Sequence, residues 1–212
     1  MGLSVGVATG LYGLSFGALS VAAGLSAAQT IALSALMFTG GSQFAFIGVI
    51  GGGGTFGAAT VAASLLGVRN GVYGVSLDAL FRPPGRLKPL YAHFTIDESM
   101  ATASAQEEPA EQRRGFWAAG LAVWALWTLF TAVGALVGEA LDPRRFGLDG
   151  AAVAAFLGLL WPRLRGRDPV AVAVVCALTT LLLVPAVPPG LPIVVAAVVA
   201  FALAGRQNRR GS

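Results

Sequence analysis

Polar and ionisable side chains interrupt long apolar stretches of this chain at three places. The first is centred on Arg69, with Asn70, Tyr73 and Ser76 after it. Arg69, Tyr73 and Ser76 stand at positions i, i+4 and i+7, so a helix would place them on one face. A guanidinium on such a polar stripe suits a substrate carboxylate. The alternatives are a position near the cytoplasmic interface, or a structural ion pair with one of three carboxylates: Asp78, Asp97 or Glu98.

The second place is the run Gly40-Gly41-Ser42-Gln43, flanked by Phe38-Thr39 and Phe44. A Gly-Gly step followed by Ser-Gln within an apolar run can unwind a helix. Backbone and side-chain donors then face a cavity. The alternative is a kink that Ser42 and Gln43 satisfy internally.

The third place is Asp97-Glu98 within the segment Thr95–Ser99. Adjacent carboxylates in a semi-apolar segment can form a proton-binding site, which would suit them to coupling or gating. An acidic loop at the membrane interface is the ordinary alternative.

Signatures of enzymes are missing from the sequence. The glycine run Gly51–Gly54 is not followed by Gly-Lys-Ser/Thr, and no His-Glu-x-x-His occurs. The one histidine, His93, cannot form a zinc site by itself, and we expect it to lie solvated at an interface. Cys176 has no second cysteine to pair with and is expected to be a small buried hydrophobe. We therefore expect a protein that is not an enzyme and holds no cofactor or metal.

Charge and hydropathy explain why these polar places stand out. Charged residues make up 11% of the 212 residues, against about 25% in soluble domains. The first 68 residues contain no Asp, Glu, Lys, Arg or His. A membrane-spanning helix needs about 20 apolar residues, and lipid requires that all backbone polar groups be satisfied internally. The sequence therefore predicts an all-α, polytopic transmembrane bundle and excludes a soluble enzyme, a nucleic-acid-binding protein and a disulfide scaffold.

Turn-prone residues divide the apolar sequence into about seven spans, with broken or re-entrant segments, in a single integral membrane domain over residues 1–212. The expected spans are Leu3–Ala23, Ala28–Ile50, Thr55–Leu80, Gly115–Gly138, Gly150–Leu164, Pro169–Val187 and Leu191–Gly205.

The orientation in the membrane depends on whether residues 87–106 cross it. If they dip in or lie at the interface, eleven basic residues share one side, against Arg144 and Arg145 on the other. If they cross, the split is eight against five. The positive-inside rule favours the first arrangement, with seven crossings and a cytoplasmic C-terminus. If the short Gly150–Leu164 segment does not span, the membrane orientation of every segment before it is reversed relative to the C-terminus.

Glycines are frequent inside the expected spans. Gly2, Gly6 and Gly10 are four residues apart, as are Gly134 and Gly138. Close packing of helices through small faces explains this spacing. A sharper alternative is that residues 10–17 form a broken helix that exposes backbone groups to a substrate.

Taken together, the three polar places resemble the AzlC-type branched-chain amino acid permeases over essentially the whole chain. Residues 38–44 look like that family's Tyr/Phe-x-Gly-Ala/Gly-Ser-Gln-Phe signature, and residues 68–77 are similar to its Arg-His-x-x-Tyr-Gly-x-Ser-Leu segment. Residues 95–99 match its Asp-Glu motif. Each motif alone is weak, but the ordered set of three is specific.

The resemblance implies a secondary exporter of leucine, isoleucine, valine and also methionine in the bacterial inner membrane. It implies proton coupling, a small AzlD-type membrane partner subunit and no nucleic acid. The substrate-binding residues would be Gly40, Gly41, Ser42, Gln43, Arg69, Asn70 and Tyr73, with Asp97 and Glu98 in coupling or gating. The substrate's apolar side chain would rest against Phe38, Phe44 and Phe46.

Two departures from the family pattern matter. Asn70 stands where the family often has histidine, so a proton-carrying histidine is not available there. The N-terminal region is short, so the usual hydrophilic leader and part of the first helix are expected to be missing. A non-transporting membrane scaffold subunit, or an exporter of another small metabolite, is the alternative function.

Overall fold

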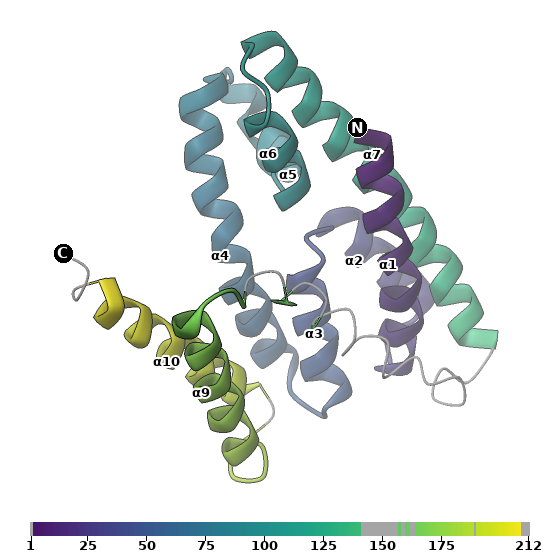
Figure 1. Ribbon diagram of the computed structural model, residues 1–212. Helices are drawn as coiled ribbons and strands as arrows, with labels where there is room; N and C mark the ends of the chain where they lie inside the picture. The colour runs from purple at the N-terminus through teal and green to yellow at the C-terminus, as the bar shows by residue number, and fades with distance from the viewer. Residues whose placement is uncertain (1, 141–156, 158–159, 162–163, 189, 209–212) are drawn as a thin grey trace.

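The computed structural model (Figure 1) describes residues 2–140, 157, 160–161, 164–188 and 190–208. Within these residues the regular secondary structure is helical throughout, as predicted. The elements are α1 (Gly2–Ala22), α2 (Ala27–Leu36), α3 (Gly41–Gly51), α4 (Phe56–Phe81), the 3₁₀ helix η1 (Gly85–Leu87), α5 (Lys88–His93), α6 (Asp97–Ser104), α7 (Pro109–Ala140), α9 (Arg167–Leu183) and α10 (Leu191–Asn208).

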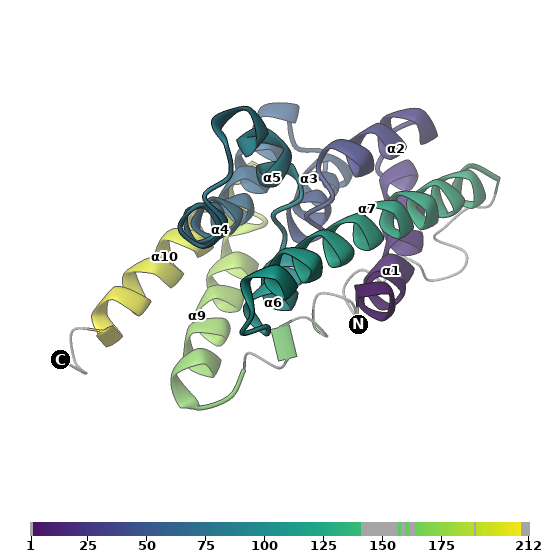
Figure 2. The same cartoon turned by 90° about the horizontal axis from the view of Figure 1, so that it is seen from above.

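Helices α1 and α7 run side by side in the same direction (Figures 1 and 2). Gly2 lies against Ala118 at one end of the pair, and Gly138 lies against Ala18 at the other. Small residues at such a face let two backbones approach closely. The packing interpretation of the glycine spacing is therefore confirmed. The broken helix considered for residues 10–17 is wrong, because α1 is continuous.

Helices α2 and α3 form a hairpin that turns back halfway along α7. The Ala27 N–H donates to Glu139 Oε1 at 3.0 Å near the end of α7, and Trp124 Nε1 donates to the Ala35 carbonyl at 3.0 Å near its middle. The chain reverses over residues 37–40, where Gly40 adopts a positive φ of 61° that suits glycine. Helix α3 then returns until Gly51 lies beside Ala23.

This hairpin corrects the predicted crossing over Ala28–Ile50: the helix is interrupted beside the Gly40-Gly41 step, as one of the two interpretations of that step expects, but the segment then turns back. The run is long and apolar enough to cross a bilayer. However, the turn at residues 37–40 sends it back to the end where it began. Hydropathy does not distinguish a helix that crosses the bilayer from a hairpin that turns back, because both bury the same apolar residues.

Helices α5 and α6 form a second hairpin that enters from the opposite end of the bundle. It begins where Lys88 Nζ pairs with Asp78 of α4 at 2.8 Å. It reaches the level of Gly120, which lies against Phe94. It then returns until Thr102 lies against Gly115. Residues 87–106 thus fold back, as predicted for a segment that does not cross.

The same arrangement, a long helix followed by a hairpin of two short helices, occurs twice in the chain and runs in opposite directions. Helix α1 is followed by a hairpin from one end, and α4, which runs the other way, is followed by a hairpin from the other end (Figure 1). Discontinuous helices within inverted repeats are a recurrent architecture of secondary transporters. The plan brings the two hairpin tips, residues 37–40 and 94–96, together at the middle of α4.

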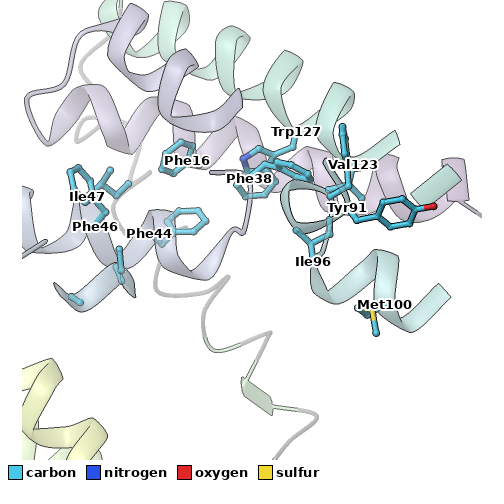
Figure 3. Close-up of a cluster of buried hydrophobic side chains, with 14 of the residues drawn as sticks. Phe16, Phe38, Phe44, Phe46, Ile47, Tyr91, Ile96, Met100, Val123 and Trp127 are labelled. Atoms are coloured by element: carbon cyan, nitrogen blue, oxygen red, sulfur yellow. The ribbon is translucent and has the colours of Figure 1, made fainter. Parts of the chain in front are cut away.

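An aromatic core holds the tips in place (Figure 3). Phe16 of α1, Phe44 of α3 and Trp127 of α7 have ring centroids 5.5–6.4 Å apart. Across the tips, the Phe38 ring lies 5.2 Å from His93 and 5.8 Å from Phe94. The solvated position expected for His93 is therefore wrong, because the imidazole is half-buried against these rings.

Two of the described helices, α1 and α7, are long and apolar enough to cross a membrane by themselves. Helix α4 has 26 residues, but Arg69 and Asp78 interrupt its apolar sequence. Helices α9 and α10 pack on each other, and α10 also touches α4. The predicted span over Gly150–Leu164 falls largely outside the described residues, as do Arg144, Arg145 and the last four residues.

We predict that Gly134→Ala destabilises the bundle by about 1–3 kcal/mol, the usual cost of overpacking. A methyl group there would overlap the Leu14 backbone of α1. Thermal unfolding of the detergent-solubilised protein measures the change. Gly48→Ala is the matched control, since no atom lies within 4 Å of its added methyl. Equal melting temperatures for the two variants would contradict the α1–α7 packing.

Candidate functional site

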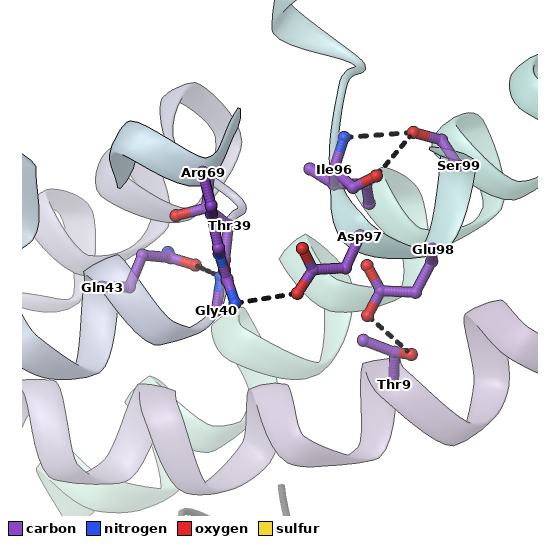
Figure 4. Close-up of polar contacts among 9 residues, drawn as sticks. All are labelled: Thr9, Thr39, Gly40, Gln43, Arg69, Ile96, Asp97, Glu98 and Ser99. Atoms are coloured by element: carbon purple, nitrogen blue, oxygen red, sulfur yellow. Dashed lines mark hydrogen bonds and ion pairs between the residues drawn. The ribbon is translucent and has the colours of Figure 1, made fainter. Parts of the chain in front are cut away.

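An ion pair between Arg69 and Asp97 connects the middle of α4 to the second hairpin (Figure 4). Arg69 Nη1 lies 2.8 Å from Asp97 Oδ2, and Nη2 donates to the Thr39 carbonyl at 3.1 Å. One guanidinium thus holds both hairpin tips. Of the three carboxylates considered as partners, Asp97 is the one that pairs with Arg69, while Asp78 pairs with Lys88.

The two tips are built alike. The Gly40 N–H donates to Gln43 Oε1 at 3.2 Å, and the Ile96 N–H donates to Ser99 Oγ at 3.1 Å. In each case a side chain in the first turn of the returning helix satisfies an orphan donor. The N-terminal ends of α3 and α6, which carry partial positive charge, therefore both face the middle of the bundle.

Buried polar atoms without a hydrogen-bond partner gather around this ion pair. Six of the eight such side-chain atoms in the described part of the chain belong to Thr39, Ser42, Gln43, Arg69, Asn70 and Asp97. Ser42 and Gln43 are 1% and 0% exposed. Leaving a buried polar group unsatisfied costs about 1–3 kcal/mol, so this concentration makes the cluster a candidate site for a polar ligand.

An apolar cavity of about 800 Å³ is lined by three residues of this cluster, Thr39, Ser42 and Asn70, while Gln43, Arg69 and Asp97 lie beyond its lining. Its size falls within the range of about 300–1,000 Å³ usual for small-molecule sites. It extends from Gly24 and Phe56 at one end of the bundle to Thr39, Ser42 and Asn70 at the middle. Its wall is mainly aliphatic and aromatic, with contributions from Leu25, Leu33, Met37, Phe46 and Ile50.

The structure brings most of the predicted site residues together. Ser42 and Asn70 line the cavity, Gln43 caps the first tip, and Gly41 lies beside the Arg69 guanidinium. Tyr73 is half-buried against the hydrophobic core and lines neither this cavity nor the smaller one described below. Ser76 is exposed and donates to the Val72 carbonyl, so the predicted polar stripe ends before it.

The aromatic residues expected around the substrate divide between two places. Phe46 lines the cavity. Phe38 and Phe44 instead lie in the aromatic core, in contact with His93 and Trp127, and neither lines the cavity. Thr39 is a site residue that sequence reasoning missed, although it stands within the same motif.

Glu98 points away from the ion pair toward α1. Thr9 Oγ1 donates to Glu98 Oε1 at 3.4 Å (Figure 4). The neighbouring carboxylates therefore face different helices: Asp97 faces α4 and Glu98 faces α1. No group of three His, Cys, Asp or Glu side chains that could hold a metal occurs among the described residues.

Half-helices that meet around a polar cluster at the middle of an apolar bundle are typical of membrane transporters with discontinuous helices. The comparison with known families agrees. The AzlC protein family matches residues 4–141, and this chain belongs to that family of membrane proteins. The family is associated with branched-chain amino acid transport and is not a family of enzymes.

A curated relative is the inner membrane protein YgaZ of Escherichia coli (strain K12), which is 29% identical over 156 residues. The matched region covers 71% of this chain and 61% of YgaZ, so the chain spans about three-fifths of that relative's length. No solved structure gives a significant match.

We predict that Arg69 and Asp97 are coupled in stability. Arg69→Leu leaves a partly buried carboxylate unpaired, and Asp97→Asn in the same chain removes that charge. A double-mutant cycle of unfolding in detergent should give a coupling of roughly 0.5–3 kcal/mol. The same cycle on the half-exposed Lys88–Asp78 pair should give less, about 0.2–1 kcal/mol. Additive effects at Arg69 and Asp97 would show that the pair does not hold the tips.

Proposed function

We propose that this protein is a secondary exporter of branched-chain and other hydrophobic amino acids across the bacterial inner membrane, as a single transporter domain. The observation that carries the proposal is the cluster of unpartnered polar atoms, three of whose residues, Thr39, Ser42 and Asn70, line the inner end of an apolar cavity. Apolar walls with a few convergent polar groups are the usual composition of a small-molecule site. A hydrophobic amino acid likewise combines an apolar side chain with two polar groups, the α-carboxylate and the α-ammonium group.

The polar cluster offers partners for both charged groups of an amino acid. Arg69 Nε and Gln43 Nε2 are unused donors for the α-carboxylate. Asn70 Oδ1 and Asp97 Oδ1 are unused acceptors for the α-ammonium group. The Ser42 hydroxyl can serve either group. The aliphatic side chain of leucine, isoleucine, valine or methionine would then lie along Phe46 and Met37.

The proposal includes an orientation in the membrane, supported by the basic residues at one end of the bundle. The start of α7 and the end of α4 meet at one end of the bundle, where Arg113 donates to the Phe81 carbonyl at 2.9 Å. The basic residues at this end are Arg82, Arg86, Lys88, Arg113 and Arg114. By the positive-inside rule it faces the cytoplasm, and the 800 Å³ cavity then extends toward the periplasmic end.

This orientation changes the predicted number of crossings from seven to six. The crossing segments are α1, α4, α7, the predicted span over Gly150–Leu164, α9 and α10. Because the first hairpin folds back, the N-terminus of α1 lies at the basic, cytoplasmic end of the bundle. The cytoplasmic C-terminus that the sequence predicts is retained.

Two further elements belong to the proposal. Glu98 is the coupling carboxylate, because it faces α1 and is not neutralised by Arg69 in the way that Asp97 is.

The transporter works with a small AzlD-type membrane subunit, as expected for a member of the AzlC family. The second candidate function, a non-transporting scaffold, would leave the cavity and its unpartnered atoms without a role.

We predict that cells expressing the chain, with a candidate partner subunit, export labelled leucine faster than cells without it.

Ser42→Ala and Asn70→Ala each remove a polar contact, at about 0.5–1.5 kcal/mol for a neutral hydrogen bond. Each should therefore raise the KM for leucine by about two- to tenfold. Thr128→Val is the matched control, because Thr128 Oγ1 is also buried and unpartnered but lies outside the cavity lining.

If leucine efflux is the same with and without the folded protein, a screen of other metabolites decides between another substrate and the scaffold. Loss of assembly in the Ser42 and Asn70 variants, with no flux in any of them, would favour the scaffold.

We predict that Glu98→Gln uncouples export from the proton gradient. The amide keeps the hydrogen bond from Thr9 but cannot gain or lose a proton. Leucine efflux should become insensitive to a protonophore, while the unmodified protein loses most of its efflux. Glu107→Gln, in an exposed loop, is the control and should retain the protonophore response. Full protonophore sensitivity in Glu98→Gln would remove this residue from coupling.

A further inference from the structure

A second cavity, of about 410 Å³, lies on the other half of α4. The first cavity lies between α4 and the first hairpin; the second lies between α4 and the second hairpin. It extends from Pro83 and Lys88 at the basic end of the bundle to Gly71 and Thr95 at the middle.

The two cavities end on either side of the contact between the tips. Asn70 lines the first cavity, and the next residue, Gly71, lines the second. Arg69 and its ion pair with Asp97 stand at the same level of α4. The rings of Phe38 in the first tip and Phe94 beside the second lie 5.8 Å apart and add an aromatic contact between the tips.

The second cavity has the chemistry of an entrance for a zwitterion. Asp78 and Lys88 pair at its outer end, with side chains 51% and 54% exposed, so both remain accessible to a ligand. They offer one negative and one positive group. Val75, Leu77 and Tyr91 supply an apolar wall beside them. A hydrophobic amino acid can therefore be accommodated in this cavity as well.

We propose that the second cavity is the cytoplasmic entrance of the translocation path, and that the Arg69–Asp97 contact between the hairpin tips is the partition separating it from the periplasmic cavity. The proposal rests on the proposed function, which supplies the amino acid substrate. In this structure the ion pair is formed, and the cavities end at neighbouring residues, the first at Thr39 and Asn70 and the second at Gly71 and Thr95.

The partition has a property that suits an amino acid substrate. A zwitterion can offer its carboxylate to Arg69 and its ammonium group to Asp97 at the same time. It can therefore replace both halves of the ion pair, whereas an amine or a carboxylic acid alone would leave one charge unpaired at the middle of the bundle.

Cysteine labelling from each side of the membrane tests the partition without depending on transport. In a Cys176→Ala background, Val75→Cys places a thiol in the second cavity and Ser64→Cys places one in the first. Val72→Cys and Leu65→Cys are matched controls on α4, since all four side chains are exposed, Val75 at 74% and Val72 at 60%, but Val72 and Leu65 line neither cavity and would face lipid. The probe is a charged, membrane-impermeant methanethiosulfonate, added to whole cells or to inside-out vesicles.

The cysteine at position 75 should be labelled only from the cytoplasmic side, and that at position 64 only from the periplasmic side. Each should react at least tenfold faster than its control. With Asp97→Asn added, labelling from the second side should rise severalfold, because the partition is weakened. Labelling after denaturation in SDS shows that every cysteine is present and reactive.

The proposal is overturned if both cysteines are labelled from the same side, if position 75 reacts no faster than position 72, or if Asp97→Asn leaves the sidedness of labelling unchanged. Slower labelling in the presence of leucine is a separate readout. Correct sidedness without protection by leucine would retain the partition and count against the proposed substrate.

Discussion

The Arg69 guanidinium carries a full charge at the middle of an apolar bundle, and the rest of the site depends on how that charge is satisfied. The Arg69 side chain is 38% exposed and the Asp97 side chain 32%, so the pair is only partly removed from water, and a partly buried charge still needs a counter-charge and hydrogen bonds. Asp97 supplies the counter-charge at 2.8 Å and the Thr39 carbonyl supplies a hydrogen bond at 3.1 Å. Because these partners come from different hairpins, satisfying one side chain fixes both tips. Backbone that is not helical at this depth is tolerated only because it is buried in protein or lines a cavity.

The frame around this contact is made by close packing. The parallel pair α1 and α7 brings two backbones together through glycines, and each hairpin packs against one half of α7. Since the hairpins enter from opposite ends, each leaves a cavity between itself and α4 that stops at the middle. The two cavities and the partition between them therefore follow from one plan used twice in opposite directions.

The sequence predicts the helical class and the three polar places, because a charge or a Gly-Gly step in an apolar run needs a structural reason. It also includes the correct partner of Arg69 among three candidates. It does not predict the hairpin over Ala28–Ile50, because an apolar run of spanning length has the same hydropathy whether it crosses or folds back. The position of His93 was missed for a related reason. The polar segment beside it suggests a solvated interface, while in the fold its ring packs half-buried against Phe38 at 5.2 Å.

The most direct test of the account is whether the polar cluster recognises both charged groups of one ligand. Binding of labelled leucine to the purified protein would be measured in competition with 3-methylbutylamine, which lacks the carboxylate, and 4-methylpentanoate, which lacks the amine. If the Arg69–Asp97 pair recognises both charged groups, both analogues bind at least tenfold more weakly than leucine, since each leaves one member of the pair uncompensated. Arg69→Ala should also abolish the preference for leucine over the amine. Binding of either analogue as tightly as leucine would contradict the central claim.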